Sequence, residues 1–438
     1  MLYILFCKIV QKLLKLMNRG SSLPGEIGIK LDKKFLSRFE KPKYTVFVTG
    51  TAGKTTTASM ITNVFRNAGY RVGSNEKGSN LSYGVASSLI ENSTIFGKSK
   101  VDALILEVDE RYVKRVLPYF KPDYFVICNL SRDQLARNGH FDIVFDDIND
   151  YITDDMHLIL NADNPLSYKF SLGKNNEITY FGVSKSEFSS IDTGYKIDVN
   201  YCPKCGSKID YEYFNYGNFG SYHCTSCDFK RQDPKYPASV SDGCLVIDDV
   251  KIDITNNVLY NAYNIAATYT VCRLIGIDKA VMLKSFSNLD MKANRVEKFL
   301  VNGVSGTILL SKNETPLSYN QSIDFVSSIE DEISLVIGFT RISGRYDEKD
   351  ISWFYDIDFE KLKNNKFKEV YVVGPFAYDL AVRLVVAGID RNKIKIETNY
   401  NEIRNVVSKC SSYVYCLVYF DLEKILKKQI KDSGDKIW

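Results

Sequence analysis

The stretch from Tyr44 to Thr57, YTVFVTGTAGKTTT, constrains this chain more than any other. A run of β-branched and aromatic residues over 44–48 predicts a strand. Gly50 and Gly53 interrupt that pattern, and apolar residues then recur at helical spacing. The order of strand, glycine loop and helix is typical of a phosphate-binding loop.

The polar positions of this loop have a chemical reason. Glycines let backbone N–H groups turn toward phosphate oxygens, and the N-terminus of the following helix adds its positive end. The Lys54 ammonium is expected to reach the β- and γ-phosphates of ATP, and the Thr55 hydroxyl to ligate Mg²⁺. The predicted nucleotide contacts are Gly50, Thr51, Gly53, Lys54, Thr55 and Thr56. The loop is short, since Val48 stands where a further glycine is expected, and an ordinary glycine turn is the alternative.

Further apolar runs at 101–108, 124–129 and 157–161 alternate with helical or loop stretches. Such alternation predicts a mainly parallel sheet with helices on both faces and ligands at the carboxyl ends of the strands. Polar residues gather at those ends, and Glu107 is the carboxylate expected to hold Mg²⁺ opposite Thr55.

The predicted fold class is α/β, with a P-loop domain followed by a smaller Rossmann-like domain. At 438 residues the chain is long enough for several cores, and the domains are expected at 1–42, 43–296 and 297–438. In the last domain, strands are predicted at 306–310, 333–339, 369–373 and 413–419, and a helix at 376–387. The formal net charge of +4 is too small to indicate nucleic acid by itself.

Four of the ten cysteines form two Cys-x-x-Cys pairs separated by 18 residues. This spacing predicts a structural Zn²⁺ site in a ribbon inserted at about 195–237, with redox chemistry as the alternative. The expected ligands are Cys202, Cys205, Cys224 and Cys227. The ribbon also mixes cations with aromatic residues, a composition that would suit single-stranded nucleic acid. These residues are Lys204, Lys208, Lys230, Arg231, Tyr211, Tyr213, Phe214 and Tyr216.

The first 17 residues, MLYILFCKIVQKLLKLM, are too short and too charged to span a bilayer. At helical spacing, one face carries Lys8, Gln11, Lys12, Lys15 and Arg19, and the opposite face carries Leu5, Ile9, Leu13 and Leu16. A basic amphipathic helix of this kind suits the surface of an anionic membrane. The alternative is a helix packed on its own protein or on a partner.

Five motifs resemble, in order, the ATP-binding motifs of the Mur ligases. They are TGTAGKTTT at 49–57, LEVDE at 106–110, NLSRDQL at 129–135, NADNP at 161–165 and YNAYNIAA at 260–267. Within that family, the chain is most similar to the branch that amidates lipid II. That likeness lies in the ribbon, in SLPGEIGIKL at 22–31, in LLSKNETPLSYNQ at 309–321 and in DISWFYDIDFE at 350–360.

The resemblance implies that ATP converts the α-carboxylate of D-glutamate in the lipid II stem peptide into an acyl phosphate, which ammonia attacks to give D-isoglutamine. Asn261 and Asn264 would lie toward the nucleotide base, and Arg295 would reach a phosphate. No activated Cys–His pair is evident among ten cysteines and three histidines, so ammonia should come from a second polypeptide. The resemblance implies that this partner is a class I glutaminase in the cytoplasm. Asp350, with Asp356 in reserve, would orient the partner's histidine.

Several positions depart from the family pattern. Gln134 stands where a histidine is usual, Asn294 where a glycine is expected, and Glu314-Thr315-Pro316 replaces the usual Asn-Pro. The lysine that many Mur ligases carbamylate is not identified. An amino-acid ligase of the Mur or folylpolyglutamate type is therefore a rival reading, because it keeps the ATP chemistry and changes only the amine.

Overall fold

The computed structural model describes residues 2–17, 22–76, 79–132, 140–187, 189–192, 197–254, 259–287, 296–311, 316–340 and 351–438. These residues belong to two compact units, one formed by the described residues up to 287 and the other by those from 296 onward. The domain boundaries expected at 42/43 and 296/297 stay predictions.

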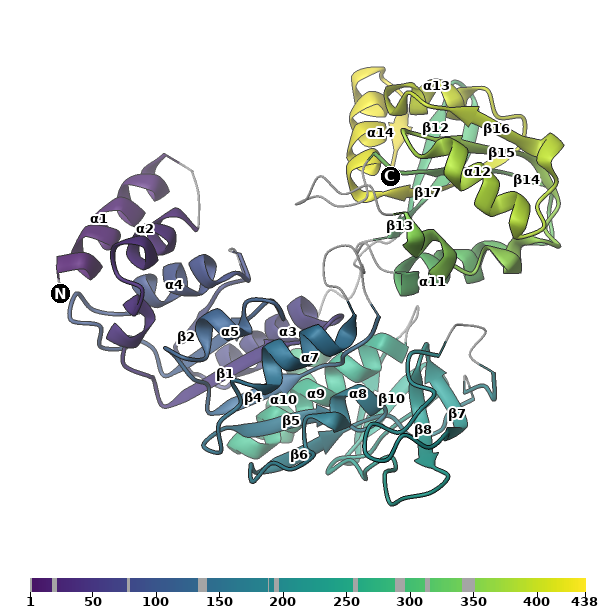
Figure 1. Cartoon of the computed structure of the whole chain (residues 1–438). Helices are drawn as coiled ribbons and strands as arrows, with labels where there is room; N and C mark the ends of the chain where they lie inside the picture. The colour runs from purple at the N-terminus through teal and green to yellow at the C-terminus, as the bar shows by residue number, and fades with distance from the viewer. Residues whose placement is uncertain are drawn as a thin grey trace. The chain divides into compact units, whose positions relative to one another are not determined.

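A six-stranded sheet with strand order β2-β3-β1-β4-β5-β6 organises the first unit (Figure 1). All five pairings are parallel, as the alternating pattern predicts. The strands are β1 (Tyr44–Thr49), β2 (Val72–Ser74), β3 (Ala103–Glu107), β4 (Tyr124–Ile127), β5 (His157–Asn161) and β6 (Ile178–Phe181). The two edge strands, β2 and β6, were not expected, because runs of three and four residues carry little periodic signal.

Helices cover both faces of this sheet. On one face, α3 contacts β1 and β3 while α9 contacts β5 and β6. On the other, Phe47, Leu104 and Phe125 share a core with α4, α5 and α7. The helices are α3 (Lys54–Asn67), α4 (Ser82–Glu91), α5 (Val113–Val116), α7 (Phe141–Asn149), α8 (Pro165–Lys169), α9 (Leu259–Ile275) and α10 (Lys279–Ser287).

Two small antiparallel sheets follow β6. The ribbon consists of β7 (Ile209–Tyr216) and β8 (Phe219–Cys224), and the other sheet consists of β9 (Ala238–Ser241), β10 (Cys244–Ile247) and β11 (Val250–Asp253). The turns joining β9 to β10 and β10 to β11 place Asp242, Gly243, Asp248 and Asp249 at positive φ. Asp-Gly flanked by short apolar runs is a hairpin signal, so part of this sheet could have been found in the sequence.

The N-terminal helix α1 (Leu2–Leu16) packs on α2 (Leu23–Leu31) and α4, and the short helix η1 (Phe35–Arg38) follows α2. Its contacts to α4 are polar: Lys8 donates to the carbonyls of Ile90 and Ser93, and Gln11 donates to that of Ser87. Burial lowers the pKa of Lys8 to about 8, with Lys100 adding to the effect. The helix therefore packs on its own protein through a side that combines Lys8 and Gln11 with the buried Ile4 and Cys7, while Lys12 stays exposed.

The second unit holds a seven-stranded mixed sheet with strand order β16-β15-β14-β17-β13-β12-β18. The strands are β12 (Val296–Val301), β13 (Val304–Ser311), β14 (Ile333–Gly338), β15 (Phe367–Val373), β16 (Ile394–Glu397), β17 (Tyr413–Tyr419) and β18 (Lys436–Ile437). The helices are α11 (Pro316–Ser327), η2 (Ser352–Asp356), η3 (Phe359–Leu362), α12 (Ala377–Val386), η4 (Arg391–Lys393), η5 (Tyr400–Glu402), α13 (Ile403–Ser408) and α14 (Phe420–Asp432).

The sheet of this unit has a core on each side. One core includes residues of α11, η2, η3 and α12, and the other includes residues of α13 and α14. The four strands and the helix predicted from the sequence all form here, with ends that differ by at most two residues. Across the described parts of both units, no helix is long and apolar enough to cross a membrane.

Candidate active site

The loop between β1 and α3 is shaped by its two glycines. Gly50 and Gly53 have φ values of +130° and +83°, a region that other residues rarely adopt. A Cβ atom on Gly50 would also lie 2.7 Å from the carbonyl oxygen of Asn129, and one on Gly53 would lie 2.4 Å from Oδ1 of Asn264. Glycine is therefore required at both positions, and the loop is tightly packed against β4 and α9.

Asn129, just beyond β4, fastens the loop from the side. Its backbone carbonyl accepts a hydrogen bond from the N–H of Thr51 at 3.0 Å. Its side chain accepts from the N–H of Ala52 at 3.0 Å and donates to the carbonyl of Ala52 at 2.9 Å. These bonds fix the loop to the segment that follows β4.

Lys54 begins α3 and lies beneath the loop. Its ammonium donates to the carbonyls of Gly50 and Thr51, and it forms an ion pair with Glu110 at 2.9 Å. The side chains of Lys54 and Glu110 are only 13% and 3% exposed, so the pair is shielded from water. Burial acts to lower the pKa of Lys54, but nearby carboxylates, Glu110 foremost, outweigh it and raise that pKa. Lys54 is therefore a fixed positive charge at the loop.

Three carboxylates lie at the end of β3: Glu107 is its last residue, and Asp109 and Glu110 follow it. Glu107 accepts a hydrogen bond from the Asn80 side chain at 2.8 Å, which orients its carboxylate. It also contributes, less than Glu110 and Asp109, to the raised pKa of Lys54. Thr55 and Thr56 are exposed in the first turn of α3. An oxygen-rich edge of this kind suits Mg²⁺, and the assignment of Thr55 and Glu107 as its ligands stays a prediction.

Both asparagines predicted on α9 are buried, and Asn264 contacts the loop. Oδ1 of Asn264 accepts a hydrogen bond from the Thr57 hydroxyl at 3.2 Å. Its Nδ2 is buried and has no hydrogen-bond partner among the described residues. A buried amide donor without a partner is costly, so a ligand oxygen at this place would satisfy it. The structure thus places Asn264 beside the phosphate loop.

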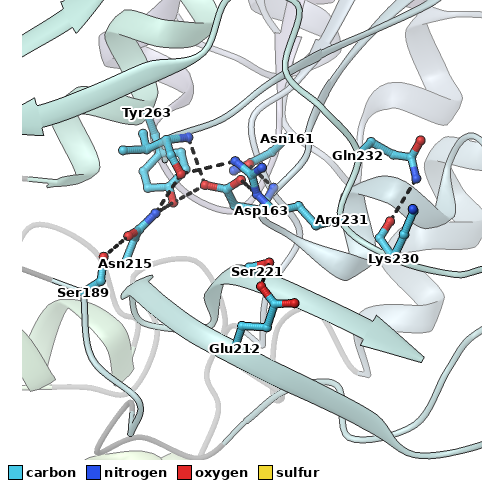
Figure 2. A network of polar contacts seen from close by, with 11 residues as sticks. Asn161, Asp163, Ser189, Glu212, Asn215, Ser221, Lys230, Arg231, Gln232 and Tyr263 are labelled. Atoms are coloured by element: carbon cyan, nitrogen blue, oxygen red, sulfur yellow. Dashed lines mark hydrogen bonds and ion pairs between the residues drawn. The ribbon is translucent and has the colours of Figure 1, made fainter. Parts of the chain in front are cut away.

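A buried polar network joins the end of β5 to α9 and to the segment after β8 (Figure 2). Asp163 accepts hydrogen bonds from the Tyr263 hydroxyl at 2.6 Å and the Val183 N–H at 2.9 Å, and it pairs with Arg231 at 2.7 Å. Asn215 on β7 donates to the Tyr263 hydroxyl at 3.3 Å. Burial raises the pKa of Asp163, against the opposing effect of Arg231. This network fixes the ribbon to the P-loop unit.

The four cysteines of the ribbon converge as their spacing predicts. Their sulfur atoms all lie within 4.8 Å of one another, with 3.6 Å between Cys202 and Cys227 and 3.4 Å between Cys205 and Cys224. Tetrahedral zinc thiolate, with bonds of about 2.3 Å, separates its sulfurs by about 3.8 Å. The N–H groups of Lys204 and Ser226 point at the sulfurs of Cys202 and Cys224. The residues therefore fit a closed metal site.

The ribbon residues that would favour nucleic acid are engaged in other contacts. Lys204 and Lys208 form ion pairs with Asp228 and Asp210. Arg231 forms an ion pair with Asp163. The ring of Phe214 is buried, and the ring of Tyr211 stacks on it with 4.6 Å between the ring centroids. Five of the eight ribbon residues that would suit nucleic acid therefore take part in the ribbon's own contacts.

Removing a metal ion from the four cysteines should destabilise the whole P-loop unit and not the ribbon alone, because Cys202, Cys224 and Phe229 belong to the core of that unit. We expect chelator to lower the unfolding temperature and to cost several kcal/mol of stability, because structural zinc contributes about 10–16 kcal/mol in small domains. Calorimetry of untreated and chelated protein measures this. Cys224→Ser should behave like chelated protein and Cys244→Ser, outside the cluster, should not. Unchanged unfolding after complete metal removal would refute a structural role.

In the second unit, Arg383 of α12 holds the segment that follows residue 350. This buried guanidinium donates to the carbonyls of Phe354 and Ile357 at 3.1 and 2.7 Å, and it pairs with Glu360 at 2.7 Å. Trp353 and Phe354 anchor the same segment in the core. Asp356 ends η2. The remaining predicted positions lie outside the described residues: Asp350, Arg295, Gln134, Asn294, Glu314 and Thr315.

Sequence reasoning did not single out Glu110, Asn129 or the pairing of Asp163 with Arg231 as parts of this arrangement. All but Arg231 follow strands of the parallel sheet, within the motifs LEVDE, NLSRDQL and NADNP. The expectation that polar residues gather at the carboxyl ends of the parallel strands covered these motifs, but it gave no role to the individual residues. It could not have assigned the partner of each side chain.

A P-loop at the carboxyl edge of a parallel sheet, a buried lysine and an asparagine helix packed on the loop define an ATP-dependent ligase of the Mur class. The Mur ligase middle domain, which is the ATP-binding domain of that class, matches residues 48–217. The MurT ligase C-terminal family matches residues 310–421. The chain belongs to the MurT family.

Two curated relatives are named as the MurT subunit of a glutamine-hydrolysing lipid II isoglutaminyl synthase. The protein from Staphylococcus aureus strain COL is 33% identical over 378 residues, which cover 85% of this chain and 84% of that one. The protein from Streptococcus pneumoniae strain R6 is 29% identical, with 92% and 91% covered. A pseudomurein peptide ligase type C from Methanothermus fervidus has the same fold, with a TM-score of 0.66, 18% identity and coverage of 92% and 81%.

Proposed function

We propose that this chain amidates the α-carboxylate of D-glutamate in the lipid II stem peptide, giving D-isoglutamine, with ATP as the energy source and ammonia from a partner glutaminase. The relatives' names supply the substrate and the nitrogen donor. The observation that carries the proposal is the shielded pair of Lys54 and Glu110 beneath a phosphate loop.

The chemistry has two steps. A carboxylate oxygen attacks the γ-phosphorus of ATP, so that an acyl phosphate forms and ADP leaves. Ammonia then attacks the acyl carbon, the amide forms and inorganic phosphate leaves. Lys54 and the loop N–H groups neutralise charge on the transferred phosphoryl group. Thr55 and Glu107 would hold Mg²⁺, which when bound offsets phosphate charge, and Arg295 is a further proposed phosphate contact.

The family resemblance implies that Asn264 lies toward the nucleotide base, but its unpartnered amide lies beside the phosphate loop and predicts a phosphate contact instead. In Asn264→Asp the carboxylate still accepts from Thr57, but it repels phosphate where the amide would donate. A hydrogen bond to a charged group contributes about 1.5–3 kcal/mol, so we expect the KM for ATP to rise about tenfold to a hundredfold. Steady-state kinetics at saturating ammonia measure this KM. Asn67→Asp, at the end of α3 away from the loop, is the control for a new carboxylate, and an unchanged KM for ATP in Asn264→Asp would refute the contact.

The proposed nitrogen source is a GatD-type glutaminase that forms a heterodimer with this chain. Each histidine here has another engagement: His140 caps α7, His157 contacts Thr179, and His223 faces Glu212. We propose that Asp350 orients the catalytic histidine of the partner, with Asp356 as the second candidate. Asp356 belongs to the segment that Arg383 and Trp353 fasten to the core, and Asp350 directly precedes the described part of that segment in the sequence.

The proposed metal of the cysteine cluster is Zn²⁺ in a structural role, because four thiolates leave no open position for a reacting water. The proposed location is the cytoplasm at the inner face of the membrane, where ATP, glutamine and a lipid-linked precursor are available together.

The rival function, an amino-acid ligase of the Mur or folylpolyglutamate type, differs only in the amine. ATP turnover with lipid II should be stimulated by ammonia and left unchanged by a panel of amino acids. Stimulation by an amino acid with no response to ammonia would favour the rival. The amidation proposal would then be wrong even though the ATP chemistry stands.

A further inference from the structure

The outer face of α1 is an exposed apolar stripe, defined by Leu2, Phe6, Ile9, Leu13 and Leu16. These side chains are between 50% and 76% exposed, and they lie along one side of a helix of fifteen residues. A surface helix of a globular protein normally turns such a stripe toward the core. Here the stripe points to solvent, which is unusual for an apolar surface of this extent.

The orientation of α1 is fixed by its opposite face. Lys8 donates to the carbonyls of Ile90 and Ser93, at and just beyond the C-terminal end of α4, where the helix dipole is negative. Gln11 donates to the carbonyl of Ser87, and Lys15 pairs with Glu91. Ile4 and Cys7 are the fully buried residues of the helix. Rotating the stripe inward would break these polar contacts, so the exposed stripe is a consequence of how the helix is held.

Positive charge is concentrated in the N-terminal segment that contains this helix. Residues 1–43 contain ten Lys and Arg against three Asp and Glu, a formal net charge of +7, whereas the rest of the chain has a net charge of −3. Lys12 lies beside the stripe and is exposed, as are Lys30, Lys33 and Lys34 on and after α2. Apolar side chains flanked by lysines are the combination that inserts into an anionic bilayer surface.

We propose that the apolar stripe of α1 binds the surface of a membrane rich in anionic lipids, with Leu2, Phe6, Ile9, Leu13 and Leu16 entering the headgroup region and Lys12 contacting lipid phosphates. Because α1 belongs to the same compact unit as the phosphate loop, this contact would bring the ATP site to a lipid-linked substrate. The relevance to lipid II rests on the proposed function, but the binding itself does not.

Vesicle sedimentation tests the contact without ATP, glutamine or precursor, so its failure would leave the amidation proposal untouched. We expect the full chain to bind vesicles containing phosphatidylglycerol at least tenfold more strongly than phosphatidylcholine vesicles. The variant Ile9→Gln with Leu13→Gln should lower binding to anionic vesicles at least tenfold. The control Val382→Gln with Val386→Gln changes side chains of similar exposure, 58% and 64%, on α12 and should leave binding unchanged.

Unfolding temperatures of both variants should equal that of the parent, since only exposed side chains are changed. Equal vesicle binding by the parent and the Ile9/Leu13 variant would overturn the proposal. So would an effect of that variant on self-association or on capture of the glutaminase with vesicle binding unchanged, because the stripe would then bind protein.

Discussion

Lys54→Met should lower ATP-dependent amidation at least a hundredfold, with ammonia as well as with glutamine as the nitrogen donor. The ammonium lies beneath the phosphate loop, and no other cation contacts that loop among the described residues. Losing one preorganised donor to a developing oxyanion costs about a hundredfold to a thousandfold in rate. Single-turnover formation of amidated precursor at saturating ATP measures the effect.

Loss of stability must be separated from loss of chemistry in this experiment. Lys54→Met leaves the carboxylate of Glu110 buried without its cation, a change that costs about 3–5 kcal/mol. Combining it with Glu110→Gln removes the uncompensated charge and should restore most of the unfolding temperature. Activity should stay low in the double variant. A folded double variant that amidates at the parent rate would show that Lys54 does not handle phosphate.

Asp350→Asn should abolish glutamine-dependent amidation while sparing amidation with added ammonia. The proposed role of Asp350 is to orient a histidine of the glutaminase, and removing a triad aspartate lowers the rate of such enzymes by about ten-thousandfold. None of the proposed ATP and Mg²⁺ contacts is Asp350, so this change should leave the ATP half of the reaction intact. Parallel assays of the reconstituted complex with glutamine and with ammonia give the ratio of the two amidation rates.

Asp356→Asn is the matched comparison, since it makes the same substitution six residues along the chain. The triad role belongs to the aspartate whose substitution abolishes amidation with glutamine but spares amidation with ammonia. Equal loss with glutamine and with ammonia in Asp350→Asn would count against the triad role. Size-exclusion chromatography must show that each variant still forms the complex. Otherwise, dissociation of the glutaminase could be mistaken for a misoriented catalytic histidine.

Local patterns predicted much of the fold. The strands at His157–Asn161 and Tyr413–Tyr419 form with the predicted ends, because runs of β-branched, apolar and aromatic residues give a strong local signal. Cysteine spacing likewise predicted the ribbon, since two Cys-x-x-Cys turns can meet in few ways. Short edge strands such as β2 gave no such signal.

The orientation of side chains could not be predicted in the same way. Helical spacing divided α1 into a basic and an apolar face, but it does not tell which of the two meets the protein. The answer depends on the carbonyls of Ile90 and Ser93, which accept hydrogen bonds from Lys8 and lie more than eighty residues from it in the sequence. The pairing of Asp163 with Arg231 is equally long-range. Patterns in a sequence report local periodicity, whereas these contacts depend on the finished fold.

The most direct test of the account is the mass of the precursor. Purified chain, its glutaminase partner, ATP, Mg²⁺ and glutamine are incubated with lipid II, and the stem peptide is analysed by mass spectrometry. We predict replacement of one carboxyl OH by NH₂ on the D-glutamate residue, together with one ADP released for each amide formed. A precursor of unchanged mass in the presence of active partner and ATP would contradict the account.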